Sequence, residues 1–179
     1  MTPKLRKAAF FALLLTLCGA VQAQEAVKAL VGQKSREVQI LCGPEQEKSL
    51  FFYGQNCYFS LALAPDAQKA LADAAQKYLL QYDEKRLKKP KGADKKRRLA
   101  KVPARLEWGP RKDALQRSAK TEISLGYVFY GKSPYFYAEI PKEKSQEAGQ
   151  SPAYGESEPQ SLLFNRSQLK ALLALLAGL

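Results

Sequence analysis

Hydrophobic and polar residues alternate in two segments near the start of the chain, which predicts two β-strands. In residues 36–42 every second position from Val38 is apolar, and in residues 56–63 every second position from Cys57 is apolar. A period of two places alternate side chains on opposite faces of a strand, so each strand is expected to bury one face. Joined through the loop 43–56, the two strands are expected to pair antiparallel.

An apolar stripe at three- and four-residue steps predicts a long helix that begins at Pro65. These steps place side chains on one face of a helix, and proline is well tolerated in a first turn. Strong helix formers continue to Leu87. The stripe consists of Ala67, Ala70, Leu71, Ala74, Ala75, Tyr78, Leu79 and Tyr82.

The second half of the chain predicts three further strands. They are expected at 104–108, 121–130 and 135–140, and the last two would form a hairpin rich in aromatic residues. Residues 142–160 carry almost no large apolar side chains and are interpreted as a mobile loop.

The end of the chain predicts a short edge strand at 162–164 and a final helix. Asn165 or Ser167 is expected to cap this helix. Its apolar stripe consists of Leu169, Leu172, Leu173 and Leu176.

These elements predict an α+β fold, with a single domain at 36–179 in which two main helices pack on an antiparallel β-sheet. The alternative is a small β-barrel or an open sandwich with appended helices. Residues 24–35 carry few apolar anchors and are interpreted as a loose N-terminal lead-in.

The first 23 residues have the three parts of a secretory signal peptide. A basic start is followed by an uncharged run at 8–23, with small residues at a cleavage site before Gln24. This run is shorter than the roughly 20 residues that a membrane-spanning helix needs. We therefore expect an exported protein, periplasmic or secreted, without a transmembrane helix in the mature chain. A lipid anchor at Cys18 is the alternative, although bulky Leu17 precedes that cysteine.

The composition excludes several kinds of catalytic and metal site. The chain has 179 residues, of which 46% are hydrophobic, so it can bury the core of an ordinary domain. It contains no histidine. This excludes Ser-His-Asp and Cys-His nucleophile systems, zinc sites with histidine ligands, and haem bound through histidine. No cofactor and no metal are expected.

Signal-peptide removal would leave Cys42 and Cys57 as the remaining cysteines. An even number of cysteines in an oxidising compartment favours a disulfide between them. Closing this 15-residue loop would stabilise the fold by about 3 kcal/mol in the chain-entropy model. The alternative is that both are small residues of the core.

Positive charge is concentrated in residues 84–101, which we call the basic segment. It holds ten basic and two acidic residues, and the rest of the mature chain is close to neutral. Such a run is either a solvated linker or a site for an anionic envelope polymer, a lipid headgroup or a protein. Nucleic acid is not expected, because the run lacks aromatic residues for base stacking. The basic residues are Lys85, Arg86, Lys88, Lys89, Lys91, Lys95, Lys96, Arg97, Arg98 and Lys101.

Residues Gly126 to Ser133 match the P-loop spacing G-x-x-x-x-G-K-S. A P-loop needs a flexible turn that wraps phosphate with backbone N–H groups and leads into a helix. Here the four intervening residues are bulky strand formers, and the strand pattern resumes after Pro134. Nucleotide binding is therefore not expected.

The leading functional hypothesis is a non-catalytic cell-envelope or secreted domain that binds an anionic or protein partner. A second hypothesis is an extracytoplasmic hydrolase without histidine. It would need convergent carboxylates among Glu107, Glu122 and Glu139, or a pair of Ser133 with a lysine. The third is a purely structural envelope protein.

Overall fold

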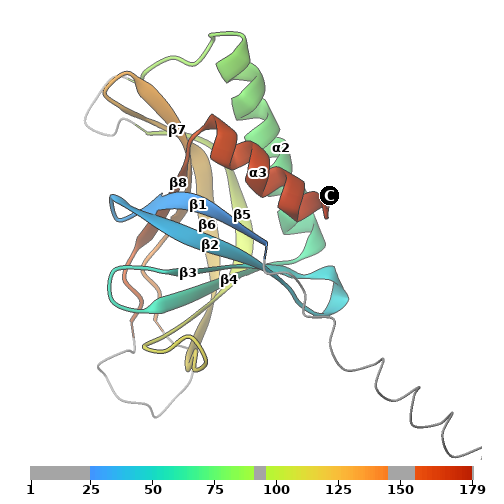
Figure 1. The fold of residues 1–179 in the computed structure, drawn as a ribbon, viewed down its shortest axis with the longest axis vertical. Helices are drawn as coiled ribbons and strands as arrows, with labels where there is room; N and C mark the ends of the chain where they lie inside the picture. The colour runs from blue at the N-terminus through green and yellow to red at the C-terminus, as the bar shows by residue number, and fades with distance from the viewer. Residues whose placement is uncertain (1–24, 91–95, 145–155, 179) are drawn as a thin grey trace, which may run out of the picture.

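The computed structural model describes residues 25–90, 96–144 and 156–178 of the chain (Figure 1). Within them the chain forms eight β-strands, two α-helices and one short 3-10 turn. In chain order these are β1 (Glu25–Val31), β2 (Lys34–Cys42), η1 (Pro44–Gln46), β3 (Lys48–Tyr53), β4 (Tyr58–Leu63), α2 (Pro65–Asp83), β5 (Lys96–Gly109), β6 (Arg117–Tyr130), β7 (Ser133–Ile140), β8 (Gln160–Phe164) and α3 (Arg166–Ala177).

The strands form one antiparallel sheet in which neighbours follow one another in sequence order. β1 also pairs with β8, placing Leu30 opposite Leu163, so the sheet closes on itself. An antiparallel sheet with two helices agrees with the predicted α+β class, but strands dominate the architecture. The closure agrees with the barrel alternative and not with an open sandwich.

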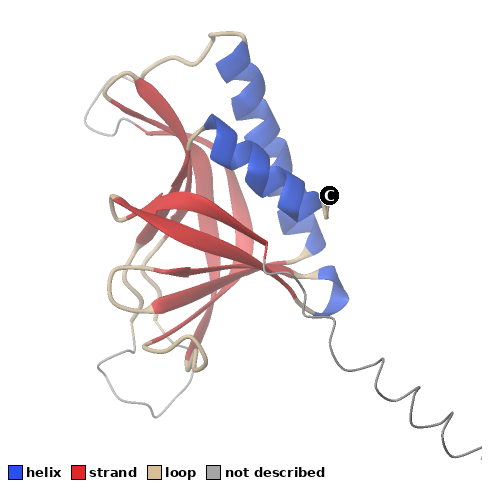
Figure 2. Ribbon diagram, viewed as in Figure 1, coloured by secondary structure: helices blue, strands red, loops and turns tan. Residues whose placement is uncertain are grey.

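The hydrophobic core lies between the inner face of the closed sheet and the two helices, which cover one side of it (Figure 2). Alternate strand residues point into this core, as Val102 and Leu106 of β5 and Ile123 and Leu125 of β6 do. α2 contacts β4, β5 and β6, whereas α3 contacts β1, β7 and β8. Each fully buried aliphatic side chain contributes roughly 1.5–3 kcal/mol, so this alternation is a main source of the stability.

The helix predicted to begin at Pro65 is confirmed, and it ends at Asp83. Its small alanines let the helix axis approach the sheet closely, whereas Leu80 on the opposite side is 58% exposed. The buried residues of the predicted stripe are Ala67, Leu71, Ala74, Ala75 and Tyr78.

Both ends of α3 are capped by side chains. Asn165 is the N-cap of α3. Its side-chain oxygen accepts a hydrogen bond from the backbone N–H of Gln168, and the Gln168 side-chain oxygen accepts one from the backbone N–H of Asn165, which is a capping box. At the other end, Lys48 Nζ donates to the carbonyl oxygens of Leu175 and Leu176. A positive charge at a helix C-terminus is favourable. The predicted stripe is confirmed at Leu169, Leu172 and Leu176, which are buried.

Three predictions of irregular or edge structure are wrong. The prediction of a loose lead-in at 24–35 is wrong, because β1 begins at Glu25 and pairs with β2 along its whole length. The predicted loop 43–56 contains β3, which pairs with β2 on one side and β4 on the other. The expected direct pairing of β2 with β4 is therefore replaced by two pairings with β3. The strand at 162–164 is no edge, because β8 is bonded to both β7 and β1.

The predicted disulfide is absent from the structure, in which both cysteines are free thiols. Cys42 ends β2 opposite Lys48, the first residue of β3, whereas Cys57 directly precedes β4 at the other end of β3. About five residues of β3, at roughly 3.4 Å each, separate these positions. A disulfide needs Cα atoms within about 7 Å, so the intervening strand keeps the two cysteines apart.

We expect the two thiols to differ strongly in reactivity in the native protein. Cys42 is exposed and Cys57 is 8% exposed, and burial together with the charge of Glu158 raises the pKa of Cys57 to about 11. At pH 8 only about one Cys57 in a thousand is then ionised, and the thiolate is the reactive form. Mass spectrometry of the chain without residues 1–23, after iodoacetamide treatment at pH 8, is expected to show one adduct, at Cys42, and a second after unfolding. A protein that takes up no adduct even when unfolded would contain the disulfide instead.

Several predictions concern residues that lie outside those the structure describes. They are the signal peptide at 1–23 with Cys18, most of the loop 142–160, and Lys91 and Lys95 of the basic segment. Among the described helices, none has the length and apolar character needed to cross a bilayer.

Candidate functional site

The basic segment is divided between an irregular connection and a strand. Residues 84–90 continue from the end of α2, and β5 begins at Lys96. Within β5, Arg97 pairs with Tyr127 and Arg98 with Gly126 of β6. The predicted strand 104–108 is therefore too short, and Lys96, Arg97 and Arg98 are held on the sheet by pairing with β6.

Several cations of the basic segment lie apart from any carboxylate among the described residues. Three cations are ion-paired: Arg86 with Glu84, Lys96 with Glu139, and Lys101 with Glu122. The cations without an acidic partner in residues 25–90, 96–144 and 156–178 are Lys85, Lys88, Lys89, Arg97 and Arg98. Their charges add into a positive potential at this end of the molecule, which attracts anions.

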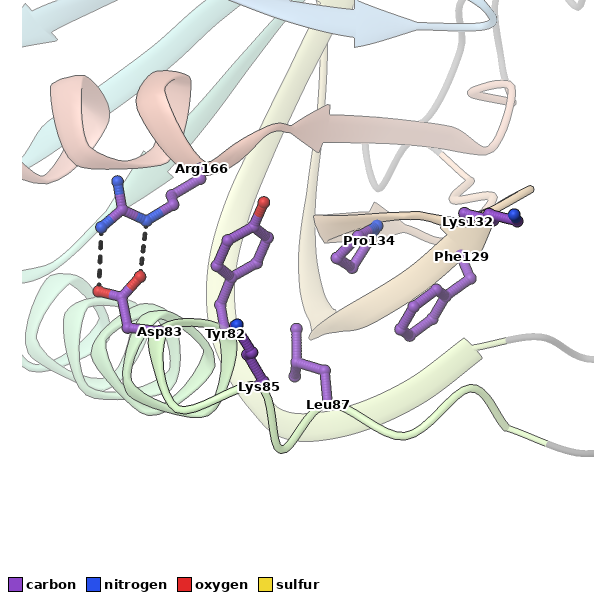
Figure 3. Close-up of a pocket in the computed structure, with 8 residues that line it drawn as sticks. All are labelled: Tyr82, Asp83, Lys85, Leu87, Phe129, Lys132, Pro134 and Arg166. Atoms are coloured by element: carbon purple, nitrogen blue, oxygen red, sulfur yellow. Dashed lines mark hydrogen bonds and ion pairs between the residues drawn. The ribbon is translucent and has the colours of Figure 1, made fainter.

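A pocket of about 630 Å³ lies where α2 ends, beside the start of α3 and the turn between β6 and β7 (Figure 3). We call it the hairpin pocket. Its wall combines four apolar or aromatic residues with four charged ones. These are Tyr82, Leu87, Phe129 and Pro134, and Asp83, Lys85, Lys132 and Arg166.

A two-pronged ion pair forms part of the wall of the hairpin pocket. Arg166 Nε donates to Asp83 Oδ1 at 2.7 Å and Arg166 Nη2 donates to Asp83 Oδ2 at 3.0 Å (Figure 3). The Arg166 guanidinium carbon lies 5.8 Å from the centre of the Tyr82 ring. The hydrogen bonds from Arg166 hold the pKa of Asp83 below its ordinary value. The pair therefore stays charged at neutral pH and joins α2 to α3.

Long-range hydrogen bonds fix the walls of the hairpin pocket. Tyr78 Oη donates to the carbonyl oxygen of Pro134 at 3.1 Å. Lys89 Nζ donates to the carbonyl oxygen of Gly131 at 3.2 Å. Together they tie α2 and residues 84–90 to the turn between β6 and β7, so the pocket is formed before any ligand arrives.

Two smaller pockets also border the basic segment. One, of about 400 Å³, lies between α2 and β5 and is lined by Arg86, Lys88 and Arg97 among others. The other, of about 320 Å³, includes Lys96 and Arg98. The basic segment therefore supplies cations to all three pockets.

The carboxylates considered for a hydrolase do not share one of these pockets. Each forms its own ion pair: Glu107 with Arg105, Glu122 with Lys101, and Glu139 with Lys96. Ser133 is exposed at the start of β7 and has no hydrogen bond to a lysine within the described ranges. No group of three or more acidic or cysteine residues in the described part of the chain is placed to hold a metal ion.

The segment with P-loop spacing forms a β-hairpin. Gly126 to Tyr130 belong to β6, Gly131 has a positive φ of 62° in the turn, and Ser133 begins β7. β6 pairs with β5 on one side and with β7 on the other. The segment therefore lacks the loop and following helix with which a P-loop binds phosphate.

Sequence reasoning found the basic segment but did not assign most of the hairpin pocket. Asp83 and Arg166 are 83 residues apart in the chain, so no local spacing relates them. Phe129 lies within the predicted strand 121–130, and Tyr82 ends the predicted helical stripe. Nothing in those two patterns indicates that the side chains border one cavity.

A family model described as "Uncharacterised Treponema protein" matches residues 9–178. No curated protein and no solved structure matches the chain.

Proposed function

Because the chain belongs to the family described as an uncharacterised Treponema protein, we propose its function from the geometry. It is an exported, non-catalytic domain that binds an anionic component of the cell envelope through the basic segment. The partner is a polymer or lipid surface that carries phosphate or sulfate groups. The signal-peptide pattern of residues 1–23 supports the export part of the proposal.

The observation that carries this proposal is that cations of the basic segment, several of them without an acidic partner among the described residues, line three pockets of the surface. Lys85 lines the hairpin pocket, Arg86, Lys88 and Arg97 line the second pocket, and Lys96 and Arg98 line the third. A solvated linker needs no such arrangement around cavities. Several cations within a Debye length of one another act together on a polyanion, and binding is driven by charge attraction and counterion release.

The ion pairs of the nearby carboxylates also agree with the proposal. Each of the three carboxylates that a hydrolase would use forms an ion pair with a basic residue of β5. Arg97 and Arg98 have no such partner among the described residues, and both are exposed. Both charged groups are therefore open to an anionic partner without the loss of an ion pair.

The test is binding of the protein to vesicles that contain phosphatidylglycerol, and to heparin, over a range of salt concentrations. We expect affinity to fall as salt rises, because the cations displace counterions. The double variant Arg97→Glu and Arg98→Glu is expected to bind at least about tenfold more weakly, since each basic residue near an anionic surface contributes about 1 kcal/mol.

The matched control is Lys69→Glu with Lys120→Glu, which changes the net charge equally at exposed positions outside the basic segment. This control is expected to lose less than about threefold in affinity. Equal losses in the two double variants would show that only net charge matters. Binding that is absent, or that does not respond to salt, would contradict the proposal directly.

A further inference from the structure

We infer that the hairpin pocket binds a single-chain anionic amphiphile, a molecule with one phosphate or carboxylate head and an apolar tail. The inference rests on the proposed function, because Lys85 of the basic segment supplies one of the pocket's cations. It goes further by assigning a defined cavity and a small ligand, where the proposed function needs only a charged surface.

The apolar part of the ligand is required by the floor of the pocket. Tyr82, Leu87 and Phe129 pack against the core on one side but are only partly buried. Pro134 completes this floor from β7. At about 630 Å³ the cavity is in the range that holds small organic ligands. An apolar chain laid on this floor would cover the exposed remainder of these side chains, which a hydrated inorganic anion would not do.

The charged part of the ligand is indicated by the balance of charges around the same floor. Three cations and one carboxylate line the pocket, and the Asp83 carboxylate is already engaged by Arg166. Lys85 and Lys132 therefore remain available, since neither forms an ion pair with a described residue. Figure 3 shows Lys132 on the far side of the pocket from the Arg166–Asp83 pair, with Leu87 and Pro134 between them.

The backbone at Lys85 adds an independent observation. Its φ is 56°, in the left-handed region that follows many helix ends and is usually occupied by glycine. A lysine in this conformation is held at some cost in stability. Local strain of this kind can mark a functional position, and Lys85 is one of the residues that line the pocket.

The experiment titrates the protein with dodecyl phosphate below its critical micelle concentration, followed by isothermal titration calorimetry. We expect saturable binding of one molecule per chain. Inorganic phosphate tests the head alone, and dodecyl maltoside tests the tail with an uncharged head. Both are expected to bind at least about tenfold more weakly. Equal binding of the two dodecyl compounds, or of phosphate alone, would overturn the inference, as would no binding of dodecyl phosphate.

Two variants locate the site. Lys85→Gly removes the cation and also relieves the backbone strain, so it is expected to weaken dodecyl phosphate binding about tenfold while the melting temperature stays the same or rises. Phe129→Ala removes part of the floor, and its matched control Tyr130→Ala changes a neighbour that is 51% exposed and outside the pocket. Only Phe129→Ala is expected to weaken binding. Unchanged affinity in Lys85→Gly and in Phe129→Ala would place the ligand elsewhere.

The double variant at Arg97 and Arg98 separates this inference from the proposed function. It is expected to retain dodecyl phosphate binding while losing vesicle binding, because neither arginine lines the hairpin pocket. If the protein binds vesicles in a salt-dependent manner but does not bind dodecyl phosphate, the pocket inference fails and the proposed function stands. If dodecyl phosphate binds and vesicles do not, the ligand is a free amphiphile and the envelope surface is not the partner.

Discussion

Replacing Tyr78 with alanine is expected to lower the free energy of unfolding by about 4 kcal/mol, as for other large buried aromatic side chains. Tyr78 is fully buried on α2, and its ring centre lies 5.7 Å from that of Phe136 and 6.1 Å from that of Tyr127. Truncation would leave a cavity between α2, β6 and β7. The same change would release the hydrogen bond to Pro134 and loosen the wall of the hairpin pocket.

The conservative variant Tyr78→Phe isolates the hydroxyl group. Burial raises the pKa of Tyr78 far above its ordinary value, so the hydroxyl remains a donor at neutral pH. Its loss is expected to cost about 1 kcal/mol. Urea unfolding followed by circular dichroism measures both variants. A cost near 1 kcal/mol for alanine as well would mean that α2 is not anchored through this ring.

The sequence predicts the helices well because their periods and caps are both strong. In α2 a stripe of small and aromatic residues starts directly after Pro65, and the buried positions are members of that stripe. In α3 the leucines share one stripe, and Asn165 and Gln168 have the spacing of a capping box. Local signals decide these elements, so no knowledge of distant contacts is needed.

β1 is missed because its period of two is weak. Its inner residues Val27, Ala29 and Val31 are buried, but Ala26 and Leu30 on the other face of the strand are also apolar. The contrast between faces that identifies a half-buried strand is therefore small. Pairing with β2 and β8 stabilises the strand, and such pairing cannot be deduced from the segment itself.

β3 is missed for a related reason, and the error carries over to the cysteines. Its residues 50–53 are a continuous apolar run, so no alternation of apolar and polar positions marks the strand. Both faces of the strand carry apolar side chains: Leu50 and Phe52 enter the core, and Phe51 on the other face stacks on Tyr58. Without β3, the segments that contain the two cysteines look like direct neighbours. The disulfide prediction rests on the even number of cysteines, and this false adjacency supports it.

The candidate site is predictable only in part, for a physical reason. The basic segment is a local excess of charge and is visible in the composition. The hairpin pocket combines the end of α2, the turn after β6 and the first residue of α3. Tertiary packing brings Asp83 to Arg166, and no local sequence pattern around either residue predicts this contact.

Substituting Gly126 with alanine is expected to cost at least about 3 kcal/mol, because a close-packed backbone cannot accommodate the added methyl group. A Cβ at this position would lie 2.1 Å from the backbone oxygen of Arg97 and 2.8 Å from the hydroxyl oxygen of Tyr137. Gly126 faces Arg98, where the register of β5 shifts before Ala100. The glycine therefore lets the strand that carries these arginines approach β6 at an irregular point.

The matched control is Gly131→Asn at the second glycine of the same spacing. Gly131 has a φ of 62°, and a Cβ there would meet no atom within 4 Å; asparagine adopts this backbone conformation more readily than other residues with a side chain. We expect a change of no more than about 1 kcal/mol, measured as a small shift in melting temperature. A soluble Gly126→Ala protein with the wild-type melting temperature would contradict the close approach of β5. The pair also separates two explanations of the spacing: strand packing predicts damage at the first glycine alone, whereas a turn that wraps phosphate would need both.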